Sequence, residues 1–155
     1  MVSRILRDEM LSLRSSTGET PGLIKEVRAC IKRFQQRWEI EAQLILGEGV
    51  ESIMIPAEME LQFVRILHES LSNVLRHSTA TKVVVQLNKD QFRLYMQISD
   101  NGNGFNPEIV SNERLGLRIM RERAESLGGE LSISSELGKG TTINVEAPRY
   151  NLIQE

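Results

Sequence analysis

The chain has 155 residues, enough for one domain with a buried core, and its 19 Lys and Arg against 21 Asp and Glu give a formal net charge of −2. Surfaces that bind nucleic acid or anionic membranes are typically basic, so we expect neither partner. The single cysteine, Cys30, excludes an internal disulfide, and with two histidines it supplies too few ligands for a Cys/His zinc site. We predict that Cys30 is a small core residue.

No segment of the sequence predicts a membrane span. No apolar run approaches roughly 18 residues, and the N-terminus lacks the apolar centre of a signal peptide. We therefore expect a cytoplasmic chain without direct membrane contact; an inner-membrane anchor in a longer full-length protein stays open.

Hydrophobic periodicity divides the chain into helices and strands. An amphipathic segment over 1–13 lacks a capped start and resembles the end of a longer helix, and 14–21 (RSSTGETP) is typical of a linker. The elements predicted after it are a helix over 22–38, a strand over 40–46, a helix over 57–78, strands over 81–87 and 92–99, a helix over 116–127, and strands over 130–135 and 141–147. The last two strand pairs predict antiparallel hairpins, and the order of elements favours an α+β fold with helices on one face of one sheet.

The predicted helix over 57–78 has an unusual polar face. Glu69, Asn73 and His77 are spaced i, i+4, i+8, so they lie along one stripe at intervals of about one turn (~5.4 Å). Such a stripe could hold a hydrated cation and its phosphates. For these three residues alone, an ordinary solvated helix face is the better explanation. His68 points roughly 100° away from the stripe and is left out of the site.

Two glycine-rich segments follow predicted strands or turns. DNGNGF (100–105) places a carboxylate at the end of a strand, and its glycines allow the backbone to approach a flat ligand, although an ordinary turn has the same pattern. GKGT (138–141) resembles the end of a P-loop. The earlier glycine and the strand–loop–helix context are missing, so we reject a P-loop.

Four segments in order are more specific than any one of them. HESLSNVLRHS, DNGNGF, RLGLRIMRERAESLGG and GKGTT resemble the N, G1, G2 and G3 boxes of the ATP-binding domain of sensor histidine kinases. The GLRIMRER segment is most similar to the nitrate/nitrite-sensor and degradation-sensor branch, within the superfamily of gyrase B, Hsp90 and MutL. Over residues 23–147 the resemblance implies a Bergerat-type fold, which is a two-layer α/β sandwich with a mixed sheet covered by helices on one face. It also implies ATP and Mg²⁺ as cofactors.

The resemblance implies a role for each residue that matches a box. Asn73 would coordinate Mg²⁺, and Glu69 would orient a water or act as a base near the γ-phosphate. Asp100 would accept a hydrogen bond from the adenine amino group and favour adenine over guanine. Further nucleotide contacts would come from Arg76, His77, Gly102, Gly104, Gly116, Leu117, Thr141 and Thr142. Plain solvent exposure explains Arg76 equally well, and the sequence does not choose between the two threonines, which could also be ordinary strand residues.

The resemblance also implies a domain layout and partners. The expected parts are the end of a dimerisation helix with a linker (1–21), the ATP-binding catalytic domain (22–148) and a tail (149–155), with a lid over 106–115. In such kinases the phosphorylated histidine precedes this domain, a place that neither His68 nor His77 occupies. The expected partners are a histidine-bearing dimerisation domain, in the same protein or in trans, and a response regulator. A serine kinase of the anti-sigma-factor type and a non-catalytic nucleotide-sensing module stay open as alternatives.

Overall fold

The computed structural model describes residues 22–77, 79–106 and 115–149. Its elements are α2 (Leu23–Trp38), β1 (Glu41–Leu46), the short 3-10 helix η1 (Val50–Ser52), α3 (Ala57–His77), β2 (Lys82–Lys89), β3 (Arg93–Asp100), α5 (Leu115–Ser126), β4 (Glu130–Glu136) and β5 (Gly140–Pro148). These bounds confirm the elements predicted between 22 and 148. The predicted helix over 1–13, the linker, most of the lid and nearly all of the tail lie outside the described residues.

The strands form one mixed sheet in the order β1-β2-β3-β5-β4. The pairs β2–β3 and β4–β5 are antiparallel, as the two predicted hairpins require, and β3–β5 is antiparallel as well. β1 and β2 are parallel, and α3 is the crossover that connects them. This β–α–β unit was not recognised in the sequence.

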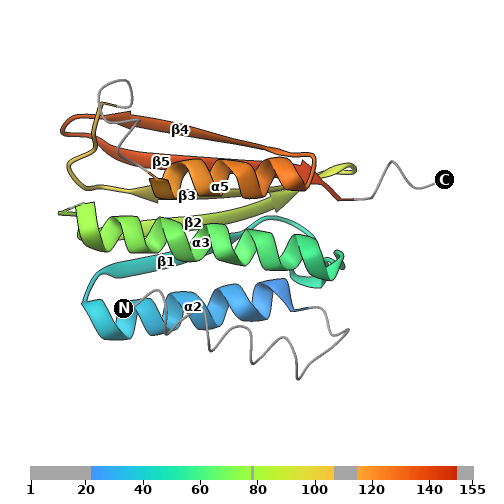
Figure 1. Cartoon of the computed structure of the whole chain (residues 1–155). Helices are drawn as coiled ribbons and strands as arrows, with labels where there is room; N and C mark the ends of the chain where they lie inside the picture. The colour runs from blue at the N-terminus through green and yellow to red at the C-terminus, as the bar shows by residue number, and fades with distance from the viewer. Residues whose placement is uncertain (1–21, 78, 107–114, 150–155) are drawn as a thin grey trace.

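The three helices form a second layer that covers one face of the sheet, with α3 between α2 and α5 (Figure 1). The strands alternate accordingly, because one face is buried under the helices and the other is solvated. The inward side chains of the central strands include Val83, Val85, Leu87, Leu94, Met96, Ile98, Ile143, Val145 and Ala147, all of which are buried. The predicted α+β two-layer fold is confirmed.

The middle helix, α3, is buried on more than its sheet-facing side. Phe63, Ile66 and Leu67 are fully buried, and even His68 and Ser70 are shielded from solvent. The reason is that α3 contacts α2 on one flank and α5 on the other. On its polar face Glu69 and Asn73 are half-buried. No helix within the described residues is long and apolar enough to cross a membrane.

Cys30 on α2 lies in the core with 1% of its surface exposed, as predicted. Burial raises the pKa of its thiol to about 12, because the thiolate would lose its hydration. Cys30 is therefore an unreactive packing residue at neutral pH.

Candidate functional site

A small cavity lies where α3, α5 and the ends of β3 and β5 meet. Its walls come from all four of the sequence segments singled out above. The lining residues are Ser70, Asn73, Val74, Ile98, Asp100, Gly104, Phe105, Leu117, Thr141 and Ile143. The cavity volume is about 30 Å³, which is room for one or two waters. A purine ring is larger, so a nucleotide base could enter only if some of the lining side chains move.

The loop after β3 is shaped around the Asp100 carboxylate. The backbone N–H of Gly102 donates to Asp100 Oδ1 at 2.8 Å, which holds the carboxylate in an Asx turn. Gly104 has a φ of +68°, and a Cβ there would overlap Glu136 O and lie 2.8 Å from Gly140 O. Because those obstacles are backbone atoms, only glycine fits. The loop is thereby packed tightly against the β4–β5 turn.

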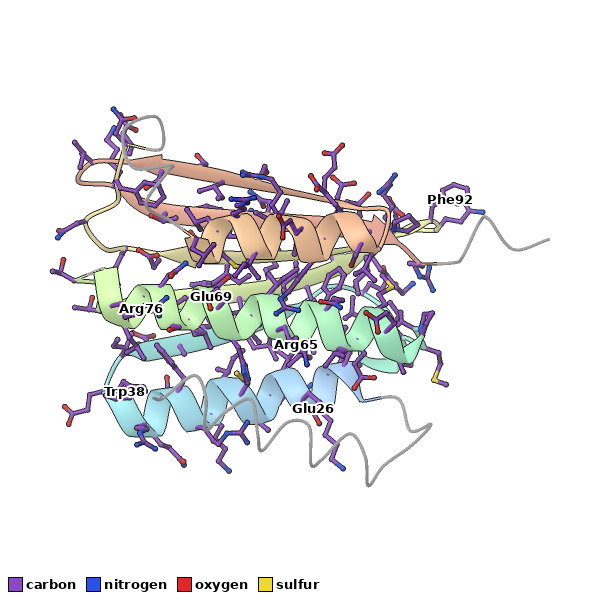
Figure 2. The ribbon with its side chains drawn as sticks, viewed as in Figure 1. Glu26, Trp38, Arg65, Glu69, Arg76 and Phe92 are labelled. Carbon is purple, nitrogen blue, oxygen red and sulfur yellow. The ribbon has the colours of Figure 1, made fainter. Side chains whose placement is uncertain are left out.

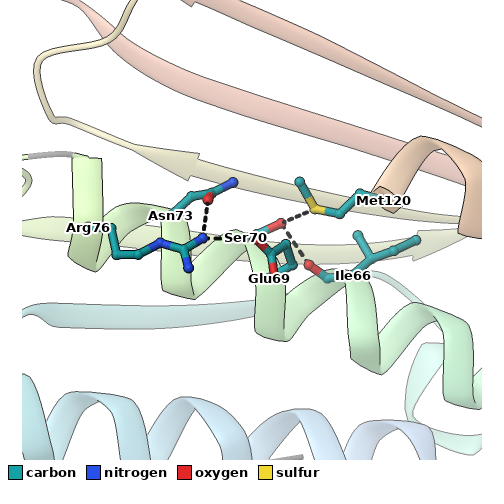
Figure 3. A network of polar contacts seen from close by, with 6 residues as sticks. All are labelled: Ile66, Glu69, Ser70, Asn73, Arg76 and Met120. Atoms are coloured by element: carbon teal, nitrogen blue, oxygen red, sulfur yellow. Dashed lines mark hydrogen bonds and ion pairs between the residues drawn. The ribbon is translucent and has the colours of Figure 1, made fainter. Parts of the chain in front are cut away.

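On α3, Glu69, Asn73 and Arg76 form a polar network near the end of the helix (Figures 2 and 3). Arg76 Nη2 donates to Glu69 Oε2 and to Asn73 Oδ1, both at 3.0 Å. The guanidinium therefore lies on the amide oxygen that the resemblance assigns to Mg²⁺. The Arg76 side chain is 51% exposed, so its ion pair with Glu69 contributes at most about 1 kcal/mol. Such a bridge can open when a stronger partner arrives.

The first turn of α5 lies directly against this network. A Cβ at Gly116 would overlap the Glu69 carboxylate, so the two segments are in close contact. Leu117, the next residue, is buried and lines the cavity. The first backbone N–H groups of a helix have no partner within the helix and attract anions. This end of α5 therefore offers donors next to Glu69.

The structure separates the two candidate threonines. Thr141 faces the helices and lines the cavity, and it lies opposite Asp100 in the β3–β5 register. Thr142 points to the open face of the sheet, where its hydroxyl lies 2.9 Å from Ser99 Oγ. The expected nucleotide contact by Thr142 does not fit this structure, because successive side chains of a strand point to opposite faces.

Ser135 helps to hold the segments around the cavity together, and it was not identified from the sequence. Its Oγ accepts a hydrogen bond from Phe105 N at 2.8 Å, lies 2.8 Å from Thr141 Oγ1 and donates to Gly140 O at 3.1 Å. It thus joins the loop after β3 to the β4–β5 turn. Strand alternation could have found it, because Ser135 lies four residues after the buried Leu131 and so on the same face.

The remaining predicted site residues have mixed outcomes. Of these, Gly102 supports Asp100 through its N–H, and Leu117 lines the cavity. His77 is the last residue of α3, and its side chain lies outside the described part of the structure. The cavity is also lined by residues that were not predicted as site residues, and these are mainly apolar: Ser70, Val74, Ile98, Phe105 and Ile143. They form walls suited to a flat aromatic ring.

These features fit one class of protein, an ATP-binding domain, in which the resemblance assigns the half-buried Asp100 carboxylate to the base and the amide of Asn73 on α3 to the metal. Residues 58–151 match the family described as histidine kinase-, DNA gyrase B-, and HSP90-like ATPase. The match covers more than half of the 155 residues, and the chain belongs to this family.

The named relatives are a sensor histidine kinase and a sensor protein. The chain is 35% identical over 145 residues to the sensor histidine kinase LiaS of Bacillus subtilis (strain 168), a match that covers 94% of this chain and 39% of LiaS. It is 41% identical over 99 residues to the sensor protein VraS of Staphylococcus haemolyticus (strain JCSC1435), covering 64% of this chain and 28% of VraS. The chain thus spans well under half the length of these relatives.

A solved structure shares the fold. The histidine kinase domain from the Erythrobacter litoralis EL346 blue-light activated histidine kinase superposes with a TM-score of 0.64 at 25% identity, covering 82% of this chain and 61% of that domain. Together these similarities confirm the resemblance to the ATP-binding domain of sensor histidine kinases. The narrower branch within those kinases stays a prediction.

Proposed function

We propose that this chain is the catalytic domain of a two-component sensor histidine kinase that binds Mg²⁺-ATP between α3, α5 and the ends of β3 and β5. In this proposal it presents the γ-phosphate to a histidine on a separate dimerisation domain, and a response regulator receives the phosphoryl group afterwards. The observation that carries the proposal is that Asn73 and Asp100, far apart in the sequence, line one cavity. The kinase relatives support it.

At the phosphate end, the available ligands suit Mg²⁺. This ion prefers hard oxygen ligands and keeps several waters, so a few protein oxygens together with phosphate oxygens are enough. Asn73 Oδ1 is such an oxygen, and Arg76 Nη2 lies 3.0 Å from it and 3.0 Å from Glu69 Oε2. Within the described residues, no group of three or more His, Cys, Asp or Glu side chains could hold a metal without nucleotide. We infer that the ion arrives with ATP and neutralises phosphate charge.

At the base end, Asp100 would select adenine. Its carboxylate can accept a hydrogen bond from the adenine amino group, whereas guanine presents an oxygen at the same place. A hydrogen bond to a charged group contributes about 1.5–3 kcal/mol, which corresponds to roughly 10- to 150-fold in affinity. Ile98 and Ile143 would contact one face of the ring, since they are cross-strand partners in the β3–β5 pair and both line the cavity.

The phosphoryl transfer itself would depend on placement. A histidine nitrogen of the partner domain attacks the γ-phosphorus in line, the bond to the β-phosphate oxygen breaks, and ADP leaves. In this proposal Glu69 would orient a water or act as a base near the γ-phosphate, and Arg76 and the backbone donors of α5, both close to Glu69, would offset charge. His68 is only 6% exposed and cannot serve as the acceptor. His77 ends the same helix, α3, that carries Asn73, so neither histidine takes the acceptor's place, and we expect no phosphorylation of the chain by itself.

Two substitutions test the site. Asn73→Asp should weaken Mg²⁺-ATP binding at least tenfold, because it places a carboxylate against phosphate oxygens. Asp100→Asn should reduce adenine affinity about 10- to 100-fold, because a neutral amide forms a weaker hydrogen bond and can present its N–H₂ to the base. Asn144→Asp is the matched control, since Asn144 lies on the open face of β5 and accepts from Gln97 Nε2 at 2.8 Å. Calorimetric titration that finds unchanged affinity for either site variant would remove that residue from the site.

The acceptor is tested separately with labelled ATP. The chain is incubated with a histidine-bearing dimerisation fragment of a sensor kinase or with a serine-containing anti-anti-sigma protein. Acid-labile label on the histidine fragment supports the proposal, and acid-stable label on the serine protein supports the serine-kinase alternative. ATP binding without any transfer would favour a nucleotide-sensing module.

A further inference from the structure

Asn101, next to Asp100, makes an unusual set of hydrogen bonds for an exposed side chain. Its Oδ1 accepts from two successive backbone N–H groups, Thr81 N at 2.9 Å and Lys82 N at 3.1 Å. Its Nδ2 donates to Thr81 Oγ1 at 3.0 Å. All three polar contacts of this one carboxamide go to a single dipeptide. A side chain that only interacted with solvent would not be expected to make all three of these contacts.

A second carboxamide of the same loop reaches the same segment. Thr79 Oγ1 donates to Asn103 Oδ1 at 2.9 Å, and Asn103 O accepts from Gly138 N at 2.6 Å. The loop over 101–104 is thus tied on one side to residues 79–82 and on the other to the β4–β5 turn.

The two tied segments continue from the two ends of the proposed ATP site. Residues 79–82 follow α3, which carries Asn73, and the loop over 101–104 follows β3, which ends at Asp100. The backbone adds only one bond between these segments after β3 ends, from Asn101 N to Lys82 O at 3.3 Å. Beyond the β2–β3 ladder, five hydrogen bonds join residues 79–82 to residues 101–104, and the Asn101 side chain makes three of them.

We propose that Asn101 is a positioning residue that sets the Asp100 carboxylate relative to the C-terminal end of α3, and so sets the preference for adenine. The inference rests on the proposed ATP-binding function. Asn101 does not line the cavity and acts through its neighbours: Asp100 precedes it, and Gly102, whose N–H holds Asp100 Oδ1, follows it. A carboxylate shifted by a fraction of an ångström forms a poorer hydrogen bond with the base, whereas phosphate contacts from α3 are unaffected.

The experiment compares ATP and GTP binding by calorimetry in Mg²⁺ buffer for the chain and its variants. Asn101→Ala removes the oxygen that accepts from both N–H groups and should lower ATP affinity about tenfold while leaving GTP affinity within twofold, so the preference for ATP shrinks. Asn101→Asp keeps an oxygen for both N–H groups and should restore ATP affinity to within threefold of the unsubstituted chain. Asn144→Ala, which removes the exposed carboxamide pair with Gln97 on the other face, should change neither affinity.

The outcomes distinguish a failure of this inference from a failure of the proposed ATP-binding function. If the unsubstituted chain binds ATP with preference and Asn101→Ala keeps that preference, or if Asn101→Asp loses as much as Asn101→Ala, Asn101 does not position Asp100. If the unsubstituted chain binds no adenine nucleotide, the proposed function fails first. If Asn101→Ala does not fold, Asn103→Ala tests the same connection, because it removes the hydrogen bond to Thr79. A smaller loss of the preference for ATP is then expected, and an unchanged preference would count against the inference.

Discussion

The β4–β5 turn offers a controlled test of how closely the Asp100 end of β3 is packed. Gly138 and Gly140 both have φ in the left-handed region, at +81° and +86°. An alanine at either place costs about 1–2 kcal/mol of backbone strain. A Cβ at Gly138 has no atom within 4 Å, whereas a Cβ at Gly140 would overlap Asp100 O and lie 3.3 Å from Asn101 Cα. The two variants therefore differ mainly in crowding against the proposed adenine site.

The expected magnitudes follow from that difference. Gly138→Ala should lose only the strain term, about 1–2 kcal/mol of unfolding free energy. Gly140→Ala should lose about 1–3 kcal/mol more, because a new methyl group must push backbone aside in a packed region. The summed loss for Gly140→Ala is about 2–5 kcal/mol, against roughly 5–15 kcal/mol for a typical domain, and the urea curves show directly whether each variant starts folded. With a urea m-value of roughly 1–3 kcal/mol/M, the Gly140→Ala midpoint should lie about 1 M below that of Gly138→Ala.

Binding should follow the same order. Gly138→Ala should bind ATP within twofold of the unsubstituted chain, while Gly140→Ala should bind it about tenfold more weakly, because the methyl group displaces the peptide of Asp100. Urea unfolding followed by far-UV circular dichroism and calorimetric titration with ATP measure the two effects. Equal midpoints and equal affinities for the two variants would refute the argument that backbone contact between Gly140 and Asp100 maintains the site.

Two pH-dependent effects are also expected. Burial raises the pKa of the Cys30 thiol from an ordinary 9.0 to about 12. The contribution of the buried thiol to stability is therefore complete below pH 9 and is lost as the pH rises from 9 toward 12. Cys30→Ala should flatten this alkaline loss, and iodoacetamide should label the thiol at pH 8 only in denaturant. The pKa of Asp90 is lowered by hydrogen bonds from Tyr95 Oη and from the N–H groups of Phe92 and Arg93, so its contribution is present above pH 3.8 and is lost as pH falls below that value. Asp90→Asn should flatten that acid limb in unfolding curves taken between pH 2 and 5, and an unchanged limb would contradict the assignment.

The sequence predicted the elements well because their patterns are local. The strands over 82–89 and 93–100 alternate and are separated by a short turn, so their antiparallel pairing follows from composition and spacing. The parallel partnership of β1 with β2 has no such local signal. It depends on how α3 packs back across the sheet, which is a tertiary property.

The candidate site was predicted only in part, because a motif identifies single residues but not how the strands and side chains are arranged in space. Asn73 and Asp100 were identified by the motifs they belong to, and the structure places both at one cavity. The choice of Thr141 over Thr142 needed the register of β5, since Ile143 is buried and Thr141 lies two residues before it on the same face. The Arg76 bridge to Glu69 and Asn73 could not have been predicted, because it depends on a side-chain rotamer. The i, i+3 spacing to Asn73 permits a contact but does not require it, and Glu69 lies seven residues from Arg76.

The two ends of the cavity are held by different kinds of interaction. Asp100 ends a strand that is paired on both sides, with β2 and with β5, and the loop after it is held by backbone contacts at Gly104 and Gly140. At the other end, Glu69 and Arg76 are partly exposed side chains joined by one ion pair. Backbone register costs little to maintain on binding, whereas side chains must be ordered. Under the proposed function, selectivity for the base would therefore be built into the fold, while the phosphate end would rearrange around the metal and the incoming histidine.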